Sequence, residues 1–143
     1  MPIPHSFTLG RKERLKSRKK IQQIFKEGSS FYEYPFRVYL MISVPDENFL
    51  QAGFSVSKKY FKRAVHRNRV KRLMREAWRL NVISLKKLMA ENHLQLNVFL
   101  IYTNKELPEF NLIQQKMKKV IGELERKVNH FVANRSFNPK TNQ

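Results

Sequence analysis

The residues best suited to chemistry form one cationic run between Lys58 and Arg79. The run contains one acid, Glu76, one histidine, His66, and ten lysines and arginines: Lys58, Lys59, Lys62, Arg63, Arg67, Arg69, Lys71, Arg72, Arg75 and Arg79. Arginine outnumbers lysine from residue 63 to residue 79, and a guanidinium presents a planar fork of donors that matches a phosphate group. The chemistry that these side chains favour is therefore the binding of a phosphate backbone.

Cleavage chemistry finds little support in the sequence. A two-metal nuclease gathers carboxylates around its metals, but this chain has a single aspartate, Asp46, in a predicted turn, and its glutamates are scattered. Paired histidines could act as acid and base, yet His5, His66, His93 and His130 stand far apart along the chain. No ligands have the short spacing of a zinc site. We expect no catalytic residue and no tightly bound metal in the protein itself.

The composition of the whole chain predicts a polyanionic partner. Its 143 residues fit one domain, and 29 basic residues against 11 acidic ones give a net charge of +18. So much positive charge repels itself, and nucleic acid, ahead of an anionic membrane surface, would offset the repulsion. The chain has no cysteine, which suits the reducing cytoplasm. We see no signal peptide, and the longest apolar run, residues 98–102, is too short to span a bilayer.

The cationic run is predicted to be an amphipathic helix. At about 100° per residue, one face holds Val70, Leu73, Met74, Ala77, Trp78 and Leu80. The opposite face holds Asn68, Arg69, Lys71, Arg72, Arg75, Glu76 and Arg79. A solvated face normally mixes signs to gain i,i+4 pairs, so we favour nucleic-acid binding over simple solvation. Arg63 and Arg67 fall on the core side, and we expect them to project from the N-terminal end of the helix.

The remaining pattern predicts a small α+β domain in the order α-β-β-α-β-α. The expected elements are a helix over 17–27, strands over 31–44 and 50–57, the cationic helix, a short helix over 80–93, a strand over 96–102 and a long helix over 112–132. Ser17 is the expected N-cap of the first helix, and Gly28 ends it.

The pairing of these strands follows from their connections. The first two strands are expected to form an antiparallel hairpin, with Arg37 and Tyr39 on its more polar face. The helix between the second and third strands predicts a crossover that joins parallel neighbours, right-handed by default. We expect one domain over residues 1–143, with an ordered body over about 7–132, an extended arm pinned by Phe7 and Leu9, and a flexible tail over 133–143.

Two stretches of the sequence resemble the protein subunit of bacterial ribonuclease P. Residues 53–59 (GFSVSKK) and 64–77 (AVHRNRVKRLMREA) closely resemble this family. The family is marked by a strand ending in S-x-K-K, followed by a helix with A-V-x-R-N-R-x-K-R. Phe7, the Glu-Arg-Leu triplet at 13–15 and residues 21–28 also look like the first part of that family. The resemblance covers about residues 7–132.

The resemblance implies a fold and a partner. The fold would be a small two-layer α/β sandwich similar to ribosomal protein S5 domain 2, with a left-handed crossover around the cationic helix. The protein would bind the catalytic RNA subunit and promote removal of the 5′ leader from precursor tRNA, while the RNA and its Mg²⁺ carry the chemistry. A cleft between the first helix and the open sheet face would hold the leader at Ile21, Phe25, Arg37 and Tyr39; Ile21 stands where the family often has phenylalanine.

The predicted RNA-binding residues are Lys58, Lys59, Lys62, Arg63, His66, Arg67, Asn68, Arg69, Lys71, Arg72, Arg75 and Arg79. We expect the pair Arg67→Ala and Arg69→Ala to weaken RNA binding and to leave the midpoint of thermal unfolding nearly unchanged. For Phe25, a place in the helix core is nearly as well supported as a leader contact. Residues 81–95 are longer than in many members of the family, and no contact is assigned to them.

Two other hypotheses fit the charge. One is a ribosomal or RNA-chaperone protein, which would lack the leader cleft and any dependence on one RNA. The other is a DNA-binding regulator, whose basic helix would enter the major groove. Such a regulator is usually dimeric, and the sequence has no helix-turn-helix pair, zipper or zinc finger.

Overall fold

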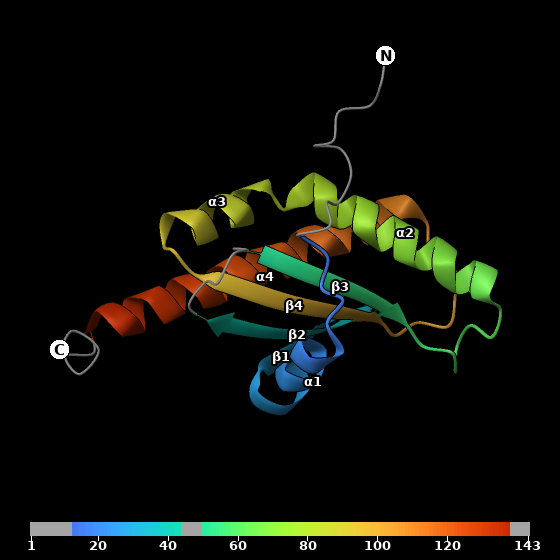
Figure 1. Cartoon of the computed structure of the whole chain (residues 1–143). Coiled ribbons are helices and arrows are strands. Elements are labelled where there is room, and N and C mark those ends of the chain that lie inside the picture. Colours follow the sequence, from blue (N-terminus) through green and yellow to red (C-terminus); the bar gives the residue numbers. More distant parts are fainter. Residues whose placement is uncertain (1–12, 44–49, 138–143) are drawn as a thin grey trace, which may run out of the picture.

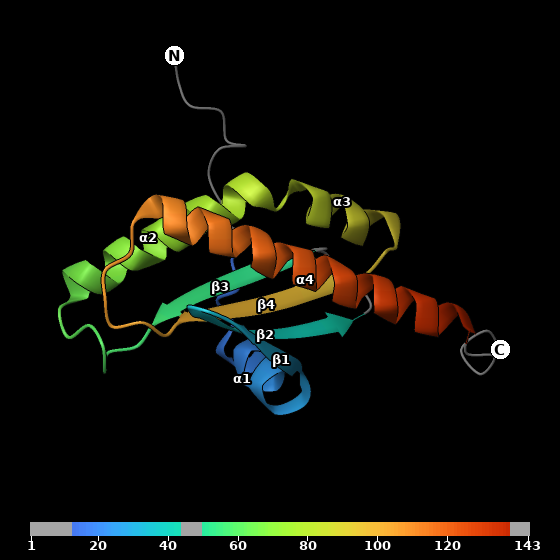
Figure 2. The same ribbon diagram turned by 180° about the vertical axis from the view of Figure 1, so that it is seen from behind.

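A single four-stranded sheet lies at the centre of the protein, with helices on both faces (Figure 1). The computed structural model describes residues 13–43 and 50–137; the predictions for Phe7, Leu9 and the turn at Asp46 lie outside these residues. The elements are α1 (Arg18–Glu27), β1 (Ser29–Glu33), β2 (Phe36–Ser43), β3 (Leu50–Val56), α2 (Ala64–Asn81), α3 (Ile83–Glu91), β4 (Gln95–Tyr102) and α4 (Phe110–Phe137). The expected α+β sandwich is confirmed, with α1 on one face and the other helices opposite (Figure 2).

The order of the strands corrects the predicted hairpin. The sheet runs β1-β2-β4-β3, so β4 separates β2 from β3, pairing antiparallel with β2 and parallel with β3. The physical reason is burial, since most of β4 is inaccessible on both faces and such a strand needs a neighbour on each side. The short connection after β2 indicated a hairpin, but burying β4 requires the central position.

The predicted first strand over 31–44 is two strands. β1 pairs antiparallel with β2, and the Tyr34–Pro35 peptide bond between them is cis. Proline lacks the N–H that a continuous ladder requires, so the predicted strand is interrupted at Pro35. The chain reverses there in a tight turn, and the side chains alternate on both sides of it. The observed order is therefore α-β-β-β-α-α-β-α instead of α-β-β-α-β-α.

The crossover between the parallel neighbours β3 and β4 is confirmed, and it passes through α2 and α3. Its hand is left, as the resemblance implies and against the right-handed default. When the sheet is viewed from the face that α2 covers, and is turned so that β3 and β4 both run up the page, β4 lies to the left of β3 (Figure 1, Figure 2). This topology places α2 over β3 at one edge of the sheet.

The core fills the space between the sheet and α2, α3 and α4. The predicted inner face of α2 is buried at Val70, Met74, Ala77 and Trp78. Leu80 is 44% exposed, contrary to the wheel, because α2 ends one residue later and the chain turns into α3. The segment 81–95 contributes α3, which buries Leu85 and Met89 in the same core, while its Ser84 donates a hydrogen bond of 2.7 Å to Glu125 of α4.

The ends of the helices agree with most of the sequence signals. The Ser17 side chain accepts a hydrogen bond from the backbone N–H of Lys20 at 3.3 Å, as expected of an N-cap. Gly28 ends α1 in an extended conformation, and a Cβ there would lie 2.4 Å from the Leu40 carbonyl oxygen. The expected tail is corrected at its start, because α4 continues to Phe137; no proline or glycine interrupts residues 133–137.

Candidate nucleic-acid interface

The outer face of α2 gathers five of the predicted residues into one shallow hollow. The hollow is lined by His66, Asn68, Arg69, Arg72 and Arg75, together with Val65. Asn68, Arg69 and Arg72 are exposed, whereas His66 and Arg75 are partly buried. The helix places them together because positions three and four apart share a face. The hollow therefore presents three guanidinium groups, an imidazole and an amide to one ligand.

Arg75 lies near two other cations, Arg14 and Arg72. Burial lowers the pKa of its guanidinium, and the nearby charges of Arg14 and Arg72 lower it further. Arginine nevertheless stays protonated at neutral pH, so positive charges are held close together at this site. An anion bound here would offset that repulsion.

Two other predicted residues are engaged within the protein. Arg79 forms an ion pair with Glu76, one turn earlier in α2. Arg67 donates two hydrogen bonds of 2.8 Å, to the backbone carbonyls of Phe61 and Lys62. As predicted, it stands in the first turn of α2, but its guanidinium folds back on the preceding loop. Arg67 thus fixes the loop to the helix.

The loop before α2 carries the remaining predicted cations. Lys58, Lys59, Lys62 and Arg63 are all exposed, and Arg63 occupies the N-cap position of α2. The hydroxyl of Ser57 accepts a hydrogen bond from the backbone N–H of Lys59 at 3.1 Å.

This loop is anchored by one buried ring and exposes another. Phe61 is 5% exposed and packs with its ring centroid 6.2 Å from that of Tyr102. The ring of Tyr60, which the sequence analysis did not single out, is 40% exposed, and the Lys59 ammonium lies 5.9 Å from its centroid.

The second predicted surface is the cleft between α1 and the sheet. The ring of Phe25 meets Tyr39 edge-on, with centroids 4.6 Å apart and an interplanar angle of 89°. It also meets Phe99 at 5.5 Å and 84°. Phe25 is 44% exposed, while its neighbour Ile24 is fully buried. The core position in α1 therefore belongs to Ile24, whereas Phe25 packs against Tyr39 and Phe99 of the sheet and stays partly exposed.

The structure adds residues from β1 and β4 to this face. Phe99 was not singled out in the sequence because it lies within the mostly apolar run of residues 96–102, which predicts a buried strand. Tyr32, on the part of the predicted first strand that forms β1, is 50% exposed, and the guanidinium of Arg37 lies 5.5 Å from its ring centroid. Ile21, the fourth predicted cleft residue, is partly buried on α1.

A short segment beside β3 joins the two surfaces. The backbone N–H of Leu15 donates to the carbonyl of Ala52 at 2.9 Å, so residues 14 and 15 run along the free edge of β3. Arg14 and Lys16 then line a small hollow with Arg75 and Gly53. The sequence showed these cations but not their position, which depends on which strand forms the edge.

Gly53 lets this segment, β3 and the cleft pack closely. A Cβ at Gly53 would lie 2.7 Å from Cδ1 of Phe99 and 3.1 Å from the carbonyl oxygen of Leu15. We expect Gly53→Ala to displace one of them and to lower the free energy of unfolding by about 1–3 kcal/mol, as overpacking does. Urea titration followed by circular dichroism measures this change.

Gly122→Ala is the matched control for that substitution. A Cβ at Gly122, in the middle of α4, meets nothing within 4 Å. Alanine there should raise the free energy of unfolding by up to about 1 kcal/mol. If the two variants were equally stable, the close approach at Gly53 would not constrain the fold.

The described residues offer little for catalysis by the protein. Across residues 13–43 and 50–137, no three His, Asp or Glu side chains are grouped as they would be to hold a metal ion. His66, His93 and His130 lie on α2, after α3 and on α4, respectively. No helix in the same part of the chain is long and apolar enough to cross a membrane.

Comparison with known proteins gives one family throughout. The model of the family described as Ribonuclease P matches residues 9–125. The ribonuclease P protein component of Porphyromonas gingivalis is 40% identical over 120 residues, covering 83% of this chain and 88% of that protein. That of Chlorobium phaeobacteroides is 33% identical over 128 residues, covering 82% and 88%.

Solved structures agree with the sequence relatives. The RNase P protein of Staphylococcus aureus is 26% identical and has a TM-score of 0.60, covering 78% of this chain and 94% of that one. The RNase P protein from Thermotoga maritima is 27% identical with a TM-score of 0.60, covering 76% and 94%.

Proposed function

Since the chain belongs to the ribonuclease P protein family, we propose that it is the protein subunit of a ribonuclease P ribonucleoprotein that matures the 5′ end of tRNA. In this proposal it binds the catalytic RNA subunit and the 5′ leader of precursor tRNA, and it acts in the cytoplasm. The observation that carries the proposal is the pair of surfaces joined at the edge of β3: a cationic helix face and an aromatic cleft.

We assign the catalytic RNA to α2 and the loop before it. The deep, narrow major groove of A-form RNA does not admit side-chain readout, so a basic helix contacts its backbone and unpaired bases. The hollow around Arg69, Arg72 and Arg75 suits this role because arginine binds phosphate through two parallel hydrogen bonds. Lys58, Lys59, Lys62 and Arg63 extend the same charge along the loop.

We assign the leader to the cleft at Phe25, Tyr39 and Phe99. A single-stranded leader has unstacked bases, and aromatic rings that bind such bases contribute roughly 1–3 kcal/mol each. Phe25 is held by two edge-on ring contacts and is still 44% exposed, so part of its surface is open to a base. Arg37, at the same face, would meet the leader backbone.

The cleavage chemistry is assigned to the RNA subunit with its Mg²⁺. The described residues bring together no group of carboxylates that would hold a metal tightly, whereas phosphate oxygens of a folded RNA bind Mg²⁺ readily. The protein then acts by position and charge. Its cations let two polyanions, the catalytic RNA and the precursor, approach each other.

The test is cleavage of precursor tRNA by the purified protein, the catalytic RNA, or both, at low Mg²⁺. We expect no cleavage by the protein alone, slow cleavage by the RNA alone, and strong stimulation by the two together. Cleavage by the protein alone would contradict the assigned chemistry. Equal rates with and without the protein would contradict the assigned role, and they would favour a general RNA-binding protein instead.

A further inference from the structure

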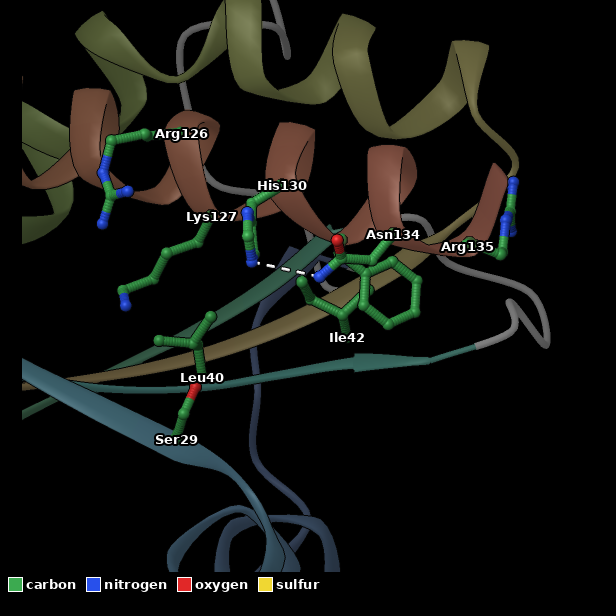
Figure 3. A pocket seen from close by; sticks show the side chains of 9 residues that line it. Ser29, Leu40, Ile42, Arg126, Lys127, His130, Asn134 and Arg135 are labelled. Carbon is green, nitrogen blue, oxygen red and sulfur yellow. Dashed lines mark hydrogen bonds between the residues drawn. The ribbon is translucent and has the colours of Figure 1, made fainter. Parts of the chain in front are cut away.

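A groove lies on the face of the sheet away from the aromatic cleft, between the C-terminal half of α4 and strands β1 and β2 (Figure 3). It encloses about 620 Å³. Leu40 and Ile42 of β2 lie on one side of the groove, and α4 supplies the wall opposite, with Arg126, Lys127, His130, Phe131, Asn134 and Arg135. Because α2 lies over β3 at the other edge of the sheet, this groove is separate from both surfaces described above (Figure 2).

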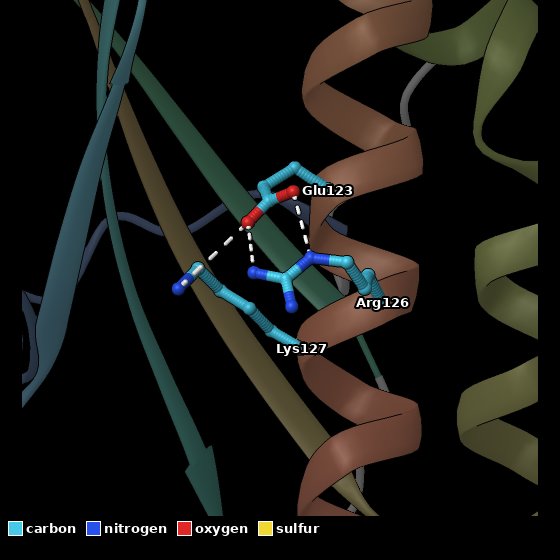
Figure 4. A network of polar contacts seen from close by, with 3 residues as sticks. All are labelled: Glu123, Arg126 and Lys127. Carbon is cyan, nitrogen blue, oxygen red and sulfur yellow. Dashed lines mark hydrogen bonds and ion pairs between the residues drawn. The ribbon is translucent and has the colours of Figure 1, made fainter.

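The groove is positively charged. Its lining contains Arg126, Lys127 and Arg135 and no acidic residue. The nearest ion pair is with Glu123, which accepts hydrogen bonds from Arg126 at 3.0 and 2.6 Å and lies 4.0 Å from the Lys127 ammonium (Figure 4). The bond from Arg126 lowers the pKa of Glu123, so this carboxylate stays ionised. The lining of the groove thus carries three cationic side chains, of which Arg126 and Lys127 share the Glu123 carboxylate.

Apolar and aromatic groups lie beside these charges. Phe131 is 37% exposed, and Leu40 and Ile42 add an aliphatic surface. The ring of His130 is also exposed, with its Nε2 3.0 Å from the side-chain nitrogen of Asn134. The Lys127 ammonium lies 5.6 Å from the centroid of the Phe31 ring, which ties this wall to β1.

These groups select an occupant that is both anionic and flat. A free phosphate would not use Phe131 or Ile42, and a duplex keeps its bases stacked inside. A single-stranded RNA offers phosphates to the cations and bases to exposed rings, which is how grooves for unpaired strands work. The net charge of +18 and the family of the chain make RNA the polyanion that this surface meets.

We propose that the groove between α4 and the β1–β2 hairpin is a further binding site for single-stranded RNA, with bases packed on Phe131 and His130 and phosphates bound by Lys127 and Arg135. The site goes beyond the proposed function, which uses neither α4 nor this side of β2. It depends on that function only for the choice of RNA over another polyanion.

The test is a titration of the full-length, isotope-labelled protein with pentauridylate, followed by the NMR signals of the His130 and Phe131 rings. We expect these signals to shift with saturation. The double variant Lys127→Ala and Arg135→Ala should weaken this binding at least tenfold. Lys118→Ala with Lys119→Ala, an equal loss of charge at exposed positions of the same helix, should change it less than twofold.

Three outcomes would overturn the proposal. The first is no shift at His130 and Phe131 while Phe25 and Tyr39 respond. The second is an equal shift with inorganic phosphate, which would leave only an anion site. The third is equal weakening by the two double variants. Arg135→Ala alone, at an exposed position, repeats the test without touching Lys127. Because no catalytic RNA is present, failure here is distinct from failure to stimulate cleavage.

Discussion

Replacing Arg72 and Arg75 together with glutamine is expected to weaken binding of the catalytic RNA by roughly 100-fold. Each hydrogen bond between a charged group and phosphate contributes about 1.5–3 kcal/mol, and tenfold in affinity is about 1.4 kcal/mol. The slope of log affinity against log salt should also fall by about two, because each lost phosphate contact removes about one unit. Electrophoretic mobility shift across a salt series measures both effects.

The same variant should fold as well as the original protein. Glutamine keeps much of the side-chain stem and is a good helix former, and replacing Arg75 removes a charge that is partly desolvated by burial and repelled by Arg14. We therefore expect the midpoint of thermal unfolding to stay the same or rise slightly. Lys118→Gln with Lys119→Gln removes the same charge from exposed positions of α4. If that control lost as much affinity, net charge alone would explain the effect and the hollow on α2 would have no special role.

The helices show how far local periodicity can lead. The face of α2 that is buried at Val70, Met74 and Trp78 was predicted from spacing alone, because the side chains on one face of a helix are fixed by a period of 3.6 residues. Leu80 shows the limit of that argument: it has the right angle on the wheel but lies where the helix ends. The end depends on how α3 packs, which is a tertiary effect.

The strands show what local pattern omits. Alternation in β2 correctly separates Tyr39 from Leu40, but it contains nothing about which strand lies next to it. Phe99 and Tyr39 are paired neighbours only because β4 takes the central position. Arg14 similarly reaches the vicinity of Arg75 only because β3 forms an edge. The parts of the candidate site that sequence analysis missed are those produced by strand order.

Arg67 shows a different limit, since the sequence indicated a phosphate contact but not the hydrogen bonds that its guanidinium donates within the protein. An arginine within a dense cationic run favours phosphate binding. The helical wheel separates Arg67 from Arg69, but it does not indicate a partner for the Arg67 guanidinium within the protein. The structure separates them: the Arg67 guanidinium is taken up by two backbone carbonyls, whereas Arg69 is exposed and lines the hollow. The expectation that both could be removed without loss of stability is therefore corrected for Arg67.

We expect Arg67→Ala to lower the midpoint of thermal unfolding by roughly 5–10 °C, and Arg69→Ala to leave it nearly unchanged. The first change removes two charged hydrogen bonds and leaves the partly buried carbonyl of Phe61 without that donor, a loss of about 2 kcal/mol. Arg67→Lys, which keeps the charge but not the fork, should recover only part of it. Differential scanning calorimetry of the three variants measures these midpoints. If the Arg67 side chain only bound phosphate and stabilised nothing within the protein, all three midpoints would be equal. Since the same bonds hold Phe61 and Lys62 against the start of α2, Arg67→Ala should also weaken RNA binding, through a displaced loop.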